Sequence, residues 1–335
     1  YNEPLTKYYP LKMKTSDKVL LILEGQQGDF VSGEAIGEEL SLTRAAIWRA
    51  VASLRKEGYK IESSTKLGYK LSDGCDRLSA EGIKALLSHP LEVLHYKEVD
   101  STNIVAKRLA LEGAKAPLVV VAESQSGGRG RGGKAFFSPP ASGLYLSLLI
   151  RPNFTTTMAL RITAAASIAA SRAIEEICGK EVEIKWVNDL FYNGKKVCGI
   201  LTEGVRGFER GKLESVVIGL GINFKTPSGG FPDEIKEVAT ALYGDRVPQG
   251  VTKNHLAAKI IDNLLSLLSQ LERPQFMDEY RQRSMVLNQE ITVYHGREQY
   301  NALVRAITDE GGLIVVLDDG SERELNSGEI SIGRV

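Results

Sequence analysis

The sequence predicts an α+β protein built from three parts, and three observations support this fold class. Residues 1–74 combine short amphipathic helices with one hairpin and an excess of basic side chains. Residues 75–283 mix apolar, strand-like runs with long helices rich in alanine and leucine. Residues 284–335 hold only short strands between turns that contain glycine. We therefore expect three domains with these boundaries.

The composition is that of a soluble globular protein, because 43% of the 335 residues are hydrophobic and 25% are charged. The formal net charge is zero, so any affinity for nucleic acid has to come from a local basic patch. The three cysteines, Cys75, Cys178 and Cys198, form no CxxC pair, which argues against a disulfide framework or a zinc site. The chain shows neither a signal-peptide pattern nor an apolar run of ~18 residues, so we expect a cytoplasmic protein that does not enter a membrane.

The first part has the element order of a winged helix-turn-helix. The stretch "SDKVLLILEG" opens with a helix cap, Ser16 or Asp17, and has apolar residues at helical spacing. Ser32 can cap a second helix, and Thr43 can cap a third helix that ends at Gly58. The following "YKIESSTKLGYKL" alternates around a Thr-Lys-Leu-Gly turn and predicts a two-stranded hairpin.

The charge of this part favours DNA binding. Between positions 44 and 70 there are seven basic and two acidic residues, a net charge of +5 in a neutral protein. A recognition helix presents the side chains of its first turns to base edges, and cations near it contact phosphates. The positions that we place there are Thr43, Arg44, Trp48 and Arg49. A winged helix that contacts protein, or a solvated basic face, are the alternatives.

The middle part contains two clear helical stretches, one after "DSTN" and one in "TTMALRITAAASIAASRAIEEICG". A third helical tract runs from Lys253 to about Arg283, with a break near Pro274. Strand-like runs are "PLVVVAES", "GLYLSLLIRP", "EVEIKWVNDLFYN", "KKVCGILTEG" and "LESVVIGLGINF". The strands of the last part are typical of a small barrel resembling an SH3 fold.

A glycine-rich, cationic stretch, "ESQSGGRGRGGKAFFSP", joins two of these strands. Glycines let backbone N–H groups approach an anion closely, while Arg129, Arg131 and Lys134 supply positive charge. The stretch is not a Walker loop, since it lacks GK[ST], and no helix follows it as in a dinucleotide fingerprint. It predicts a loop that closes over a phosphate-bearing ligand; a bare flexible loop, or an RGG segment that binds RNA, are the alternatives.

An Asn-Gly turn at positions 193–194 predicts a hairpin that brings Lys185, Asn188, Asp189 and Lys196 together. Lysines, an amide and a carboxylate near a cationic glycine loop suit nucleotidyl transfer, in which charge builds on an α-phosphate. A surface hairpin with solvated charges is the alternative.

With these motifs in place, the sequence resembles the biotin–protein ligase family, in its form that is both biotin ligase and biotin operon repressor. The matching motifs occur in the family's order: "DSTN", "AESQSGGRGRGGKAFFSP", "GLYLSL", "KWVNDL", "KKVCGIL", "GLGIN" and "ATAL". They cover the middle part, and the parts on either side complete the layout. The resemblance therefore implies a central mixed-sheet domain of the biotin/lipoate ligase type.

The resemblance also implies roles for single residues. Those expected at biotin are Ser101, Thr102, Asn103, Gln125, Gly128, Arg129, Lys196 and Gly199. Those expected at the nucleotide are Arg131, Lys185, Asn188, Asp189 and Asn223, with Asp189 as a ligand of Mg²⁺. Lys196, Arg129 and Arg131 are the expected catalytic residues.

The implied reaction has two steps, with ATP and Mg²⁺ as cofactors and biotin as substrate. Biotin and ATP give biotinyl-5′-adenylate, from which a lysine of a biotin carboxyl carrier protein takes the biotin. The adenylate-loaded protein is expected to form a homodimer and to bind operator DNA. The alternatives are a biotin-sensing repressor without catalysis and a lipoate–protein ligase, although the arginine and triple-glycine motif of the latter is missing.

Four positions depart from the family pattern, and the role of a fifth is open. Val187 replaces a proline, which is expected to loosen the turn before Asn188. Gly132 replaces an arginine, and Ala135-Phe136 replaces a Lys-Trp pair. The loop is thereby less cationic, and weaker retention of the adenylate is expected. Whether Arg334 serves the nucleotide is open.

Overall fold

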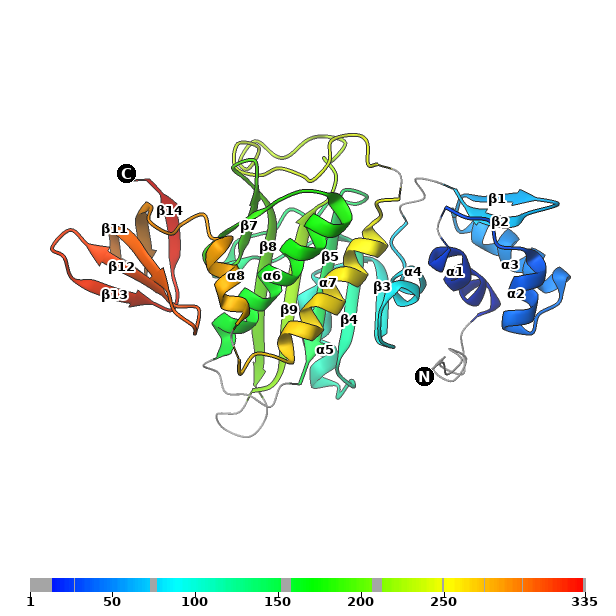
Figure 1. Ribbon diagram of the computed structural model, residues 1–335, viewed down its shortest axis with the longest axis horizontal. Helices are drawn as coiled ribbons and strands as arrows, with labels where there is room; N and C mark the ends of the chain where they lie inside the picture. Colours follow the sequence, from blue (N-terminus) through cyan, green and yellow to red (C-terminus); the bar gives the residue numbers. More distant parts are fainter. Residues whose placement is uncertain are drawn as a thin grey trace.

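The computed structural model describes residues 14–26, 28–72, 77–151, 158–206, 213–248, 250–273, 275–296 and 298–333. The three expected parts follow one another along the long axis of the molecule (Figure 1). The α+β class with an N-terminal helix-turn-helix, a central mixed sheet and a C-terminal β domain is confirmed. The predicted boundary between positions 74 and 75, together with Cys75 and Arg334, lies outside the described residues.

The N-terminal part contains three helices and a hairpin, as predicted. They are α1 (Thr15–Gly25), α2 (Gly33–Leu40), α3 (Arg44–Lys56), β1 (Ile61–Ser64) and β2 (Gly68–Leu71). The Ser32 and Thr43 hydroxyls accept hydrogen bonds from the backbone N–H groups of Ala35 and Ala46, so both predicted caps are confirmed. The predicted cap of α1 is wrong: the helix begins at Thr15, with Lys14 in the capping position and no side-chain cap.

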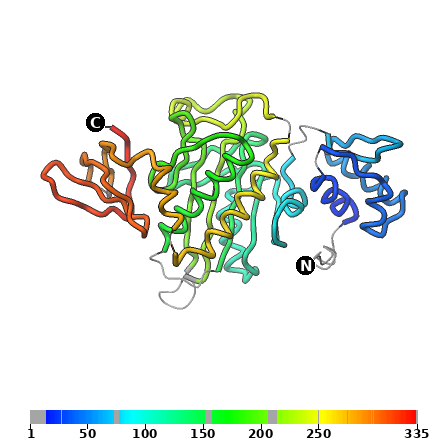
Figure 2. Tube along the Cα trace, in the orientation of Figure 1, coloured from blue at the N-terminus to red at the C-terminus, as the bar shows by residue number. Residues whose placement is uncertain are grey.

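The central part is a seven-stranded sheet in the order β3-β4-β5-β9-β8-β7-β6. Its strands are β3 (Glu92–Val99), β4 (Leu118–Gln125), β5 (Gly143–Ile150), β6 (Glu183–Lys185), β7 (Asp189–Tyr192), β8 (Lys195–Arg206) and β9 (Leu213–Asn223). Only β3 and β4 pair in parallel; the other neighbours are antiparallel. The residues between β9 and α7, yellow-green in Figure 2, cross one end of this sheet.

Helices cover the two faces of the sheet unequally. The helices are α4 (Ala80–Leu86), α5 (Thr102–Leu111), α6 (Ala159–Cys178), α7 (Lys253–Leu268) and α8 (Phe276–Gln282). Side chains alternate along a strand, so Val119 and Val121 join the large core with α6 and α7, while Val120 joins a smaller core under α5. Since α5 covers only part of its face, the remainder of that face is left for a site.

The structure departs from the sequence prediction at two places in the central part. Helix α4 and strand β3 were not predicted. The run "EVEIKWVNDLFYN" is not one strand: it turns back at Trp186–Asn188, so β6 pairs antiparallel with β7. The Asn-Gly turn is confirmed, with positive φ at both residues (50° and 73°) between β7 and β8.

The C-terminal part is a five-stranded antiparallel sheet in the order β13-β12-β11-β10-β14. Its strands are β10 (Glu290–His295), β11 (Glu298–Ile307), β12 (Leu313–Leu317), β13 (Glu322–Leu325) and β14 (Glu329–Ile332). The predicted all-strand part is thus confirmed, and its inward-facing residues belong to the large core of the central part.

A buried polar contact joins the N-terminal and central parts. The Asn254 amide, at the start of α7, donates to the Glu24 carboxylate on α1 (3.1 Å) and to the carbonyl of Arg77 (3.0 Å). Its oxygen accepts from the N–H of Ser79 (3.1 Å). Nearby, the Arg77 guanidinium lies over the Tyr59 ring. The two parts therefore meet through α1, α4 and α7 in a specific, satisfied set of hydrogen bonds.

Candidate functional site

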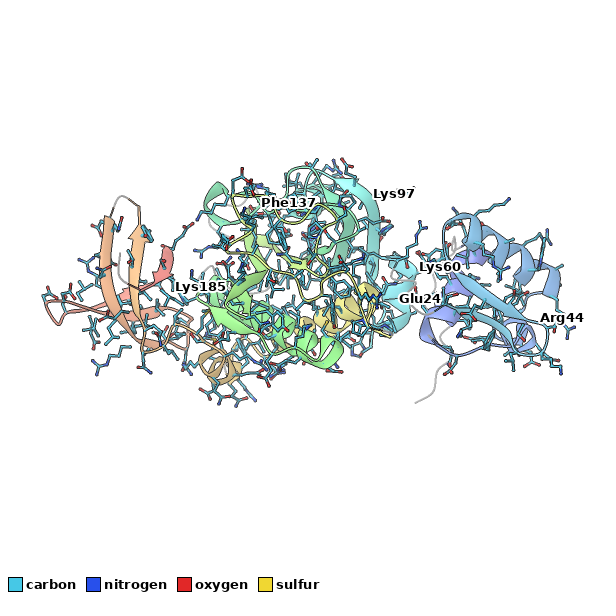
Figure 3. The ribbon with its side chains drawn as sticks, turned by 90° about the horizontal axis from the view of Figure 1, so that it is seen from above. Glu24, Arg44, Lys60, Lys97, Phe137 and Lys185 are labelled. Atoms are coloured by element: carbon cyan, nitrogen blue, oxygen red, sulfur yellow. The ribbon has the colours of Figure 1, made fainter. Side chains whose placement is uncertain are left out.

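One cavity of about 260 Å³ opens on the α5 face of the central sheet. Its walls come from the start of α5, the glycine-rich loop, the β6–β8 region and β14 of the C-terminal sheet. In Figure 3, Lys185 lies on the side of the central part that faces the C-terminal sheet. The cavity volume is close to the lower end of the range of small-molecule sites, about 300–1,000 Å³.

One end of the cavity is lined by uncharged polar side chains. Gln125, at the end of β4, accepts from the N–H of Thr102 (2.9 Å) and donates to the Ser138 hydroxyl (2.8 Å). Ser101 is the N-cap residue of α5, yet its side chain makes no capping hydrogen bond. Because this hydroxyl is not used by the helix, it is available to a molecule in the cavity.

The floor between the two ends is made by glycines and an aromatic ring. Gly199 and Gly221 lie on β8 and β9, and a Cβ on Gly221 would stand 2.5 Å from the Phe136 ring. The Phe136 ring meets Tyr145 edge-on, at 6.5 Å between centroids. The Tyr145 hydroxyl donates to the Pro139 carbonyl (3.0 Å), which ties the end of the glycine-rich loop to the sheet. Larger residues at the two glycines would displace the loop.

The other end of the cavity is cationic, and two of its cations, Lys196 and Arg131, already have polar partners. The Lys196 ammonium is 2.7 Å from the Asp189 carboxylate. Arg131 donates to the Asn188 side-chain oxygen (3.2 Å), while the Asn188 amide nitrogen donates to the Ile200 carbonyl (2.8 Å). These contacts hold the two cationic side chains in place. An incoming phosphate can replace the Asp189 carboxylate and the Asn188 oxygen as their partners.

Lys185 is a half-buried cation of this end. Burial lowers the pKa of its ammonium, and the positive charges of Lys196 and Lys134 lower it further. The carboxylates of Asp189 and Glu329 act in the opposite direction. A buried cation that lacks full compensation gains from a bound anion.

The C-terminal sheet supplies part of the wall. The Lys134 ammonium, on the glycine-rich loop, is 2.5 Å from the Glu329 carboxylate on β14. A Cβ on Gly132 would stand 3.5 Å from the same carboxylate. Gly132 has a positive φ of 62°, which tightens the loop into a short turn there. The tip of the loop therefore contacts a residue of another part of the chain.

The structure brings together most of the predicted site residues. Those that line the cavity are Ser101, Thr102, Asn103, Gln125, Arg129, Arg131, Lys185, Asn188, Asp189, Lys196 and Gly199. Two others do not line it: Gly128 is buried inside the loop, where a Cβ would stand 2.3 Å from the Phe136 carbonyl oxygen, and the Asn223 amide donates to the Thr240 carbonyl (2.9 Å). Lys134, expected from the sequence as a cation of the phosphate-binding loop, also lines the cavity, whereas the sequence analysis did not assign Phe136, Trp186, Leu201, Gly219, Gly221 and Glu329 to the site. The alternating glycines of "GLGIN" were the available signal, since they fall on one face of a strand.

The predicted DNA-contacting residues are exposed together on α3. Trp48 is 63% exposed, and Thr43, Arg44 and Arg49 are also exposed. Arg44 lies at the outer end of the molecule, away from the central part (Figure 3). Arg55 is engaged elsewhere, because its guanidinium donates to the Ile61 carbonyl (2.6 Å) and thereby holds the hairpin on α3.

The described residues contain neither a cluster of metal ligands nor a membrane-spanning helix. They contain no group of three or more His, Cys, Asp and Glu side chains that could hold a metal ion. In the same ranges, no helix is both long and apolar enough to cross a membrane.

Comparison with protein families matches each of the three parts. Residues 96–223 match the Biotin/lipoate A/B protein ligase family, and residues 15–70 match an HTH domain. Residues 286–333 match the Biotin protein ligase C terminal domain.

Curated relatives extend these matches over most of the chain. The Bifunctional ligase/repressor BirA of Bacillus subtilis (strain 168) is 35% identical over 249 residues, which cover 72% of this chain and 76% of the relative. The chain belongs to the bifunctional ligase/repressor family. A further family member, Bifunctional ligase/repressor BirA of Escherichia coli (strain K12), is 28% identical over 318 residues, 91% of this chain and 94% of the relative.

A solved structure supports the same family membership. The biotin protein ligase from Aquifex aeolicus in complex with biotin and ATP superposes with a TM-score of 0.61 at 27% identity. The match covers 73% of this chain and 99% of the other. The ligase/repressor family thus accounts for both the central fold and the N-terminal helix-turn-helix, and the related ligase was solved in complex with biotin and ATP.

Proposed function

We propose that this ligase/repressor joins biotin to a lysine of a biotin carboxyl carrier protein, and that its N-terminal part represses biotin genes when biotin is plentiful. The enzymatic half rests on one observation: the same cavity is lined by uncharged polar side chains at one end and by cationic side chains at the other. The uncharged end offers hydroxyls and an amide, which suit the neutral cyclic urea of biotin. The cationic end offers lysines and arginines, which suit an acyl phosphate.

In the first step, a carboxylate oxygen of biotin attacks the α-phosphorus of ATP and pyrophosphate leaves with the electrons of the broken P–O bond. Negative charge builds on the α-phosphate, and fixed cations stabilise it in the transition state. Lys196 is suited to this role because its ammonium is already held in place by Asp189, 2.7 Å away. On substrate binding it would turn from Asp189 to the biotin carboxylate and the phosphate. Arg131 would then help to retain the adenylate, with Arg129 beside the biotin.

The nucleotide would be held by Lys185, Asn188 and Asp189. Mg²⁺ commonly takes one or two protein carboxylates and completes its shell with water and substrate phosphates. Asp189 provides a carboxylate at the cationic end, so the donor set fits an ion held mainly by ATP itself. The bound ion would neutralise phosphate charge.

In the second step, the ε-amine of the acceptor lysine attacks the carbonyl carbon of the mixed anhydride. The bond from this carbon to the phosphate oxygen breaks, AMP leaves with that oxygen, and the amine loses a proton. The enzyme needs no nucleophile of its own. Cys198 is unsuited to that role because it is fully buried, and burial raises the pKa of its thiol far above the ordinary range.

For the regulatory half, we propose that Arg44, Trp48 and Arg49 contact operator DNA and that the adenylate-bound protein acts as a homodimer. The exposure of these side chains on one helix supports this role. Filter binding with the region upstream of a biotin gene tests it. Retention of the labelled DNA on the filter is expected to depend on biotin and ATP. A ligase whose helix-turn-helix binds no DNA would retain none.

Biotin-dependent exchange of labelled pyrophosphate into ATP tests the enzymatic half, with lipoate as the control acid. Exchange with biotin alone is expected. Exchange with lipoate would point to the lipoate–protein ligase reaction instead. No exchange with either acid would leave a biotin-sensing repressor, in which the cationic end binds a ligand without chemistry.

A further inference from the structure

A chain of buried and half-buried polar side chains runs beneath the uncharged end of the cavity. It starts at Lys107 on α5, whose ammonium is 2.5 Å from the Glu203 carboxylate on β8. The other oxygen of Glu203 accepts from the Asn103 amide (2.9 Å). Ser147 on β5 then lies between Asn103 (2.6 Å) and the Thr102 hydroxyl (2.8 Å). The chain thus connects an ion pair at the edge of α5 with a side chain in the cavity wall.

The orientation of the Asn103 amide is fixed by its neighbours. Its nitrogen faces the Glu203 carboxylate and, at 3.2 Å, the Leu201 carbonyl, and both of these are acceptors only. Its oxygen therefore points to Ser147. Gly219 makes room for this arrangement, because a Cβ there would stand 2.1 Å from the Asn103 oxygen. Both amide hydrogens of Asn103 are thus used within the protein.

Glu203 stays ionised in this setting. Burial on its own raises the pKa of the Glu203 carboxyl, but the hydrogen bonds from Lys107 and Asn103, and the charges of Lys107 and Arg129, outweigh it and hold the pKa below its usual value. An ionised carboxylate cannot donate, so it cannot reverse the Asn103 amide.

The direction of each hydroxyl proton follows from this orientation. The oxygen of Asn103 can only accept, so the Ser147 hydroxyl donates its single proton to it. Ser147 can then only accept from Thr102, whose proton is drawn to it at 2.8 Å. The alternative acceptor for that proton is the Gln125 oxygen, which lies farther away at 3.2 Å.

The orientation of Gln125 is fixed from the opposite side. The Ser138 hydroxyl donates to the Phe136 carbonyl (2.9 Å), so it can only accept from the Gln125 amide nitrogen. The Gln125 oxygen consequently faces Thr102 and the cavity. If the Thr102 proton goes to Ser147, the oxygens of both Thr102 and Gln125 keep a lone pair for a ligand.

We infer that Ser147, Asn103, Glu203 and Lys107 form a relay of positioning residues that takes up the Thr102 proton and leaves Thr102 and Gln125 as a pair of acceptors for ligand N–H groups. This deepens the proposed function and rests on it. Asn103, predicted to contact biotin, acts in this view through Thr102. The relay selects a cyclic urea with N–H at this place and rejects a ring that presents an oxygen instead.

Ser147→Ala tests the relay, because the Thr102 proton would then turn to the Gln125 oxygen and remove one acceptor. The matched control is Ser167→Ala, the same change at an equally buried serine on α6, on the opposite face of the sheet. The measured quantities are two KM ratios, biotin against each of two cyclic carbamates. In each carbamate, a different ureido N–H of biotin is replaced by oxygen. A ratio between substrates does not depend on how much of the variant is folded.

We expect Ser147→Ala to raise the biotin KM about tenfold, in line with the loss of one ligand hydrogen bond, and to keep kcat within about twofold. Discrimination against one of the two carbamates should fall by about the same factor, whereas Ser167→Ala should match the wild type. Glu203→Gln, at a side chain that is 18% exposed, should shift the ratio in the same direction by less. A Ser147→Ala ratio equal to that of the wild type overturns the relay, and an unchanged Glu203→Gln ratio removes Glu203 and Lys107 from it.

If the wild type shows no biotin-dependent pyrophosphate exchange at all, the proposed function fails, and this result is distinct from a failure of the relay.

Discussion

The two ends of the cavity are held in place in opposite ways. At the uncharged end, Thr102 and Gln125 belong to a buried hydrogen-bond network whose donors and acceptors are fixed by the fold. At the cationic end, Lys196 and Lys134 are held by carboxylates that an anionic ligand can replace. The difference follows from the two kinds of ligand chemistry. A neutral ring is recognised by matching fixed partners, whereas a reaction that builds charge needs cations whose partners can be exchanged.

The largest expected effect breaks the cationic end. Lys196→Ala should lower the rate of biotin-dependent pyrophosphate exchange by about 100- to 1,000-fold, because it removes a charge that stabilises the transition state. Lys195→Ala is the matched control, since this neighbouring ammonium points away to the Lys236 carbonyl (3.1 Å). Near-normal exchange by Lys196→Ala would show that another cation does this work.

A change at the uncharged end should act on binding instead. Thr102→Val keeps the shape of the side chain and removes its hydroxyl, so the biotin KM should rise about tenfold while kcat is kept. Thr163→Val, on the α6 face, controls for the loss of a buried threonine hydroxyl. Steady-state kinetics at saturating ATP separates the two constants. A fall in kcat with an unchanged KM would contradict the division between the two ends.

The contact with the C-terminal sheet should have a smaller effect. Glu329→Gln removes the partner of Lys134, and the two side chains are 46% and 68% exposed, so the pair is worth only about 0–1 kcal/mol. We expect the adenylate to dissociate about two- to fivefold faster, as measured by stopped flow at low salt. Glu298→Gln, which removes an exposed ion pair with Arg323 in the same sheet, should leave the rate unchanged. Equal rates for Glu329→Gln and wild type at low salt would mean that the loop is not held by this contact.

The smallest expected effect concerns the pH dependence of stability. Burial lowers the pKa of Lys185 in the folded state, so between that pKa and the ordinary value of 10.5 the unfolded chain binds more protons. The free energy of unfolding therefore gains a positive slope with pH in this window. Lys185→Met should remove that slope and raise the stability at neutral pH, which thermal melts at pH 7 to 10 can follow. An identical pH profile for both proteins would show that burial does not perturb this lysine.

Local chemistry made much of the fold predictable. The caps Ser32 and Thr43, and the Asn-Gly turn between β7 and β8, depend on residues close in sequence, and all three are confirmed. The strands of the central sheet are buried apolar runs, which periodicity detects. For the same reason, the cluster of Lys196 and Asp189 across that turn could be expected from the sequence.

Other features depend on contacts between distant segments. The fold-back that separates β6 from β7 includes a hydrogen bond from the Trp186 indole to the Gly311 carbonyl, 125 positions along the chain. The contact of Lys134 with Glu329 spans 195 positions. Helix α4 is only seven residues long and packs on α1 and α7, so its stability comes from tertiary contacts and not from its own sequence. No local pattern encodes such pairings.

The hydrogen bonds that join α1 to the start of α7 bear on how such a protein can be shortened. Cutting the chain ahead of position 77 to isolate a free-standing enzyme would delete Glu24 and leave one hydrogen of the Asn254 amide without its acceptor, while the bonds to Arg77 and Ser79 survive. It would also uncover the side of α4 on which α1 packs. Truncation thus exposes to solvent the surface that α1 covers in the whole protein. A shortened enzyme would need new surface residues there before its kinetics could be compared with those of the whole protein.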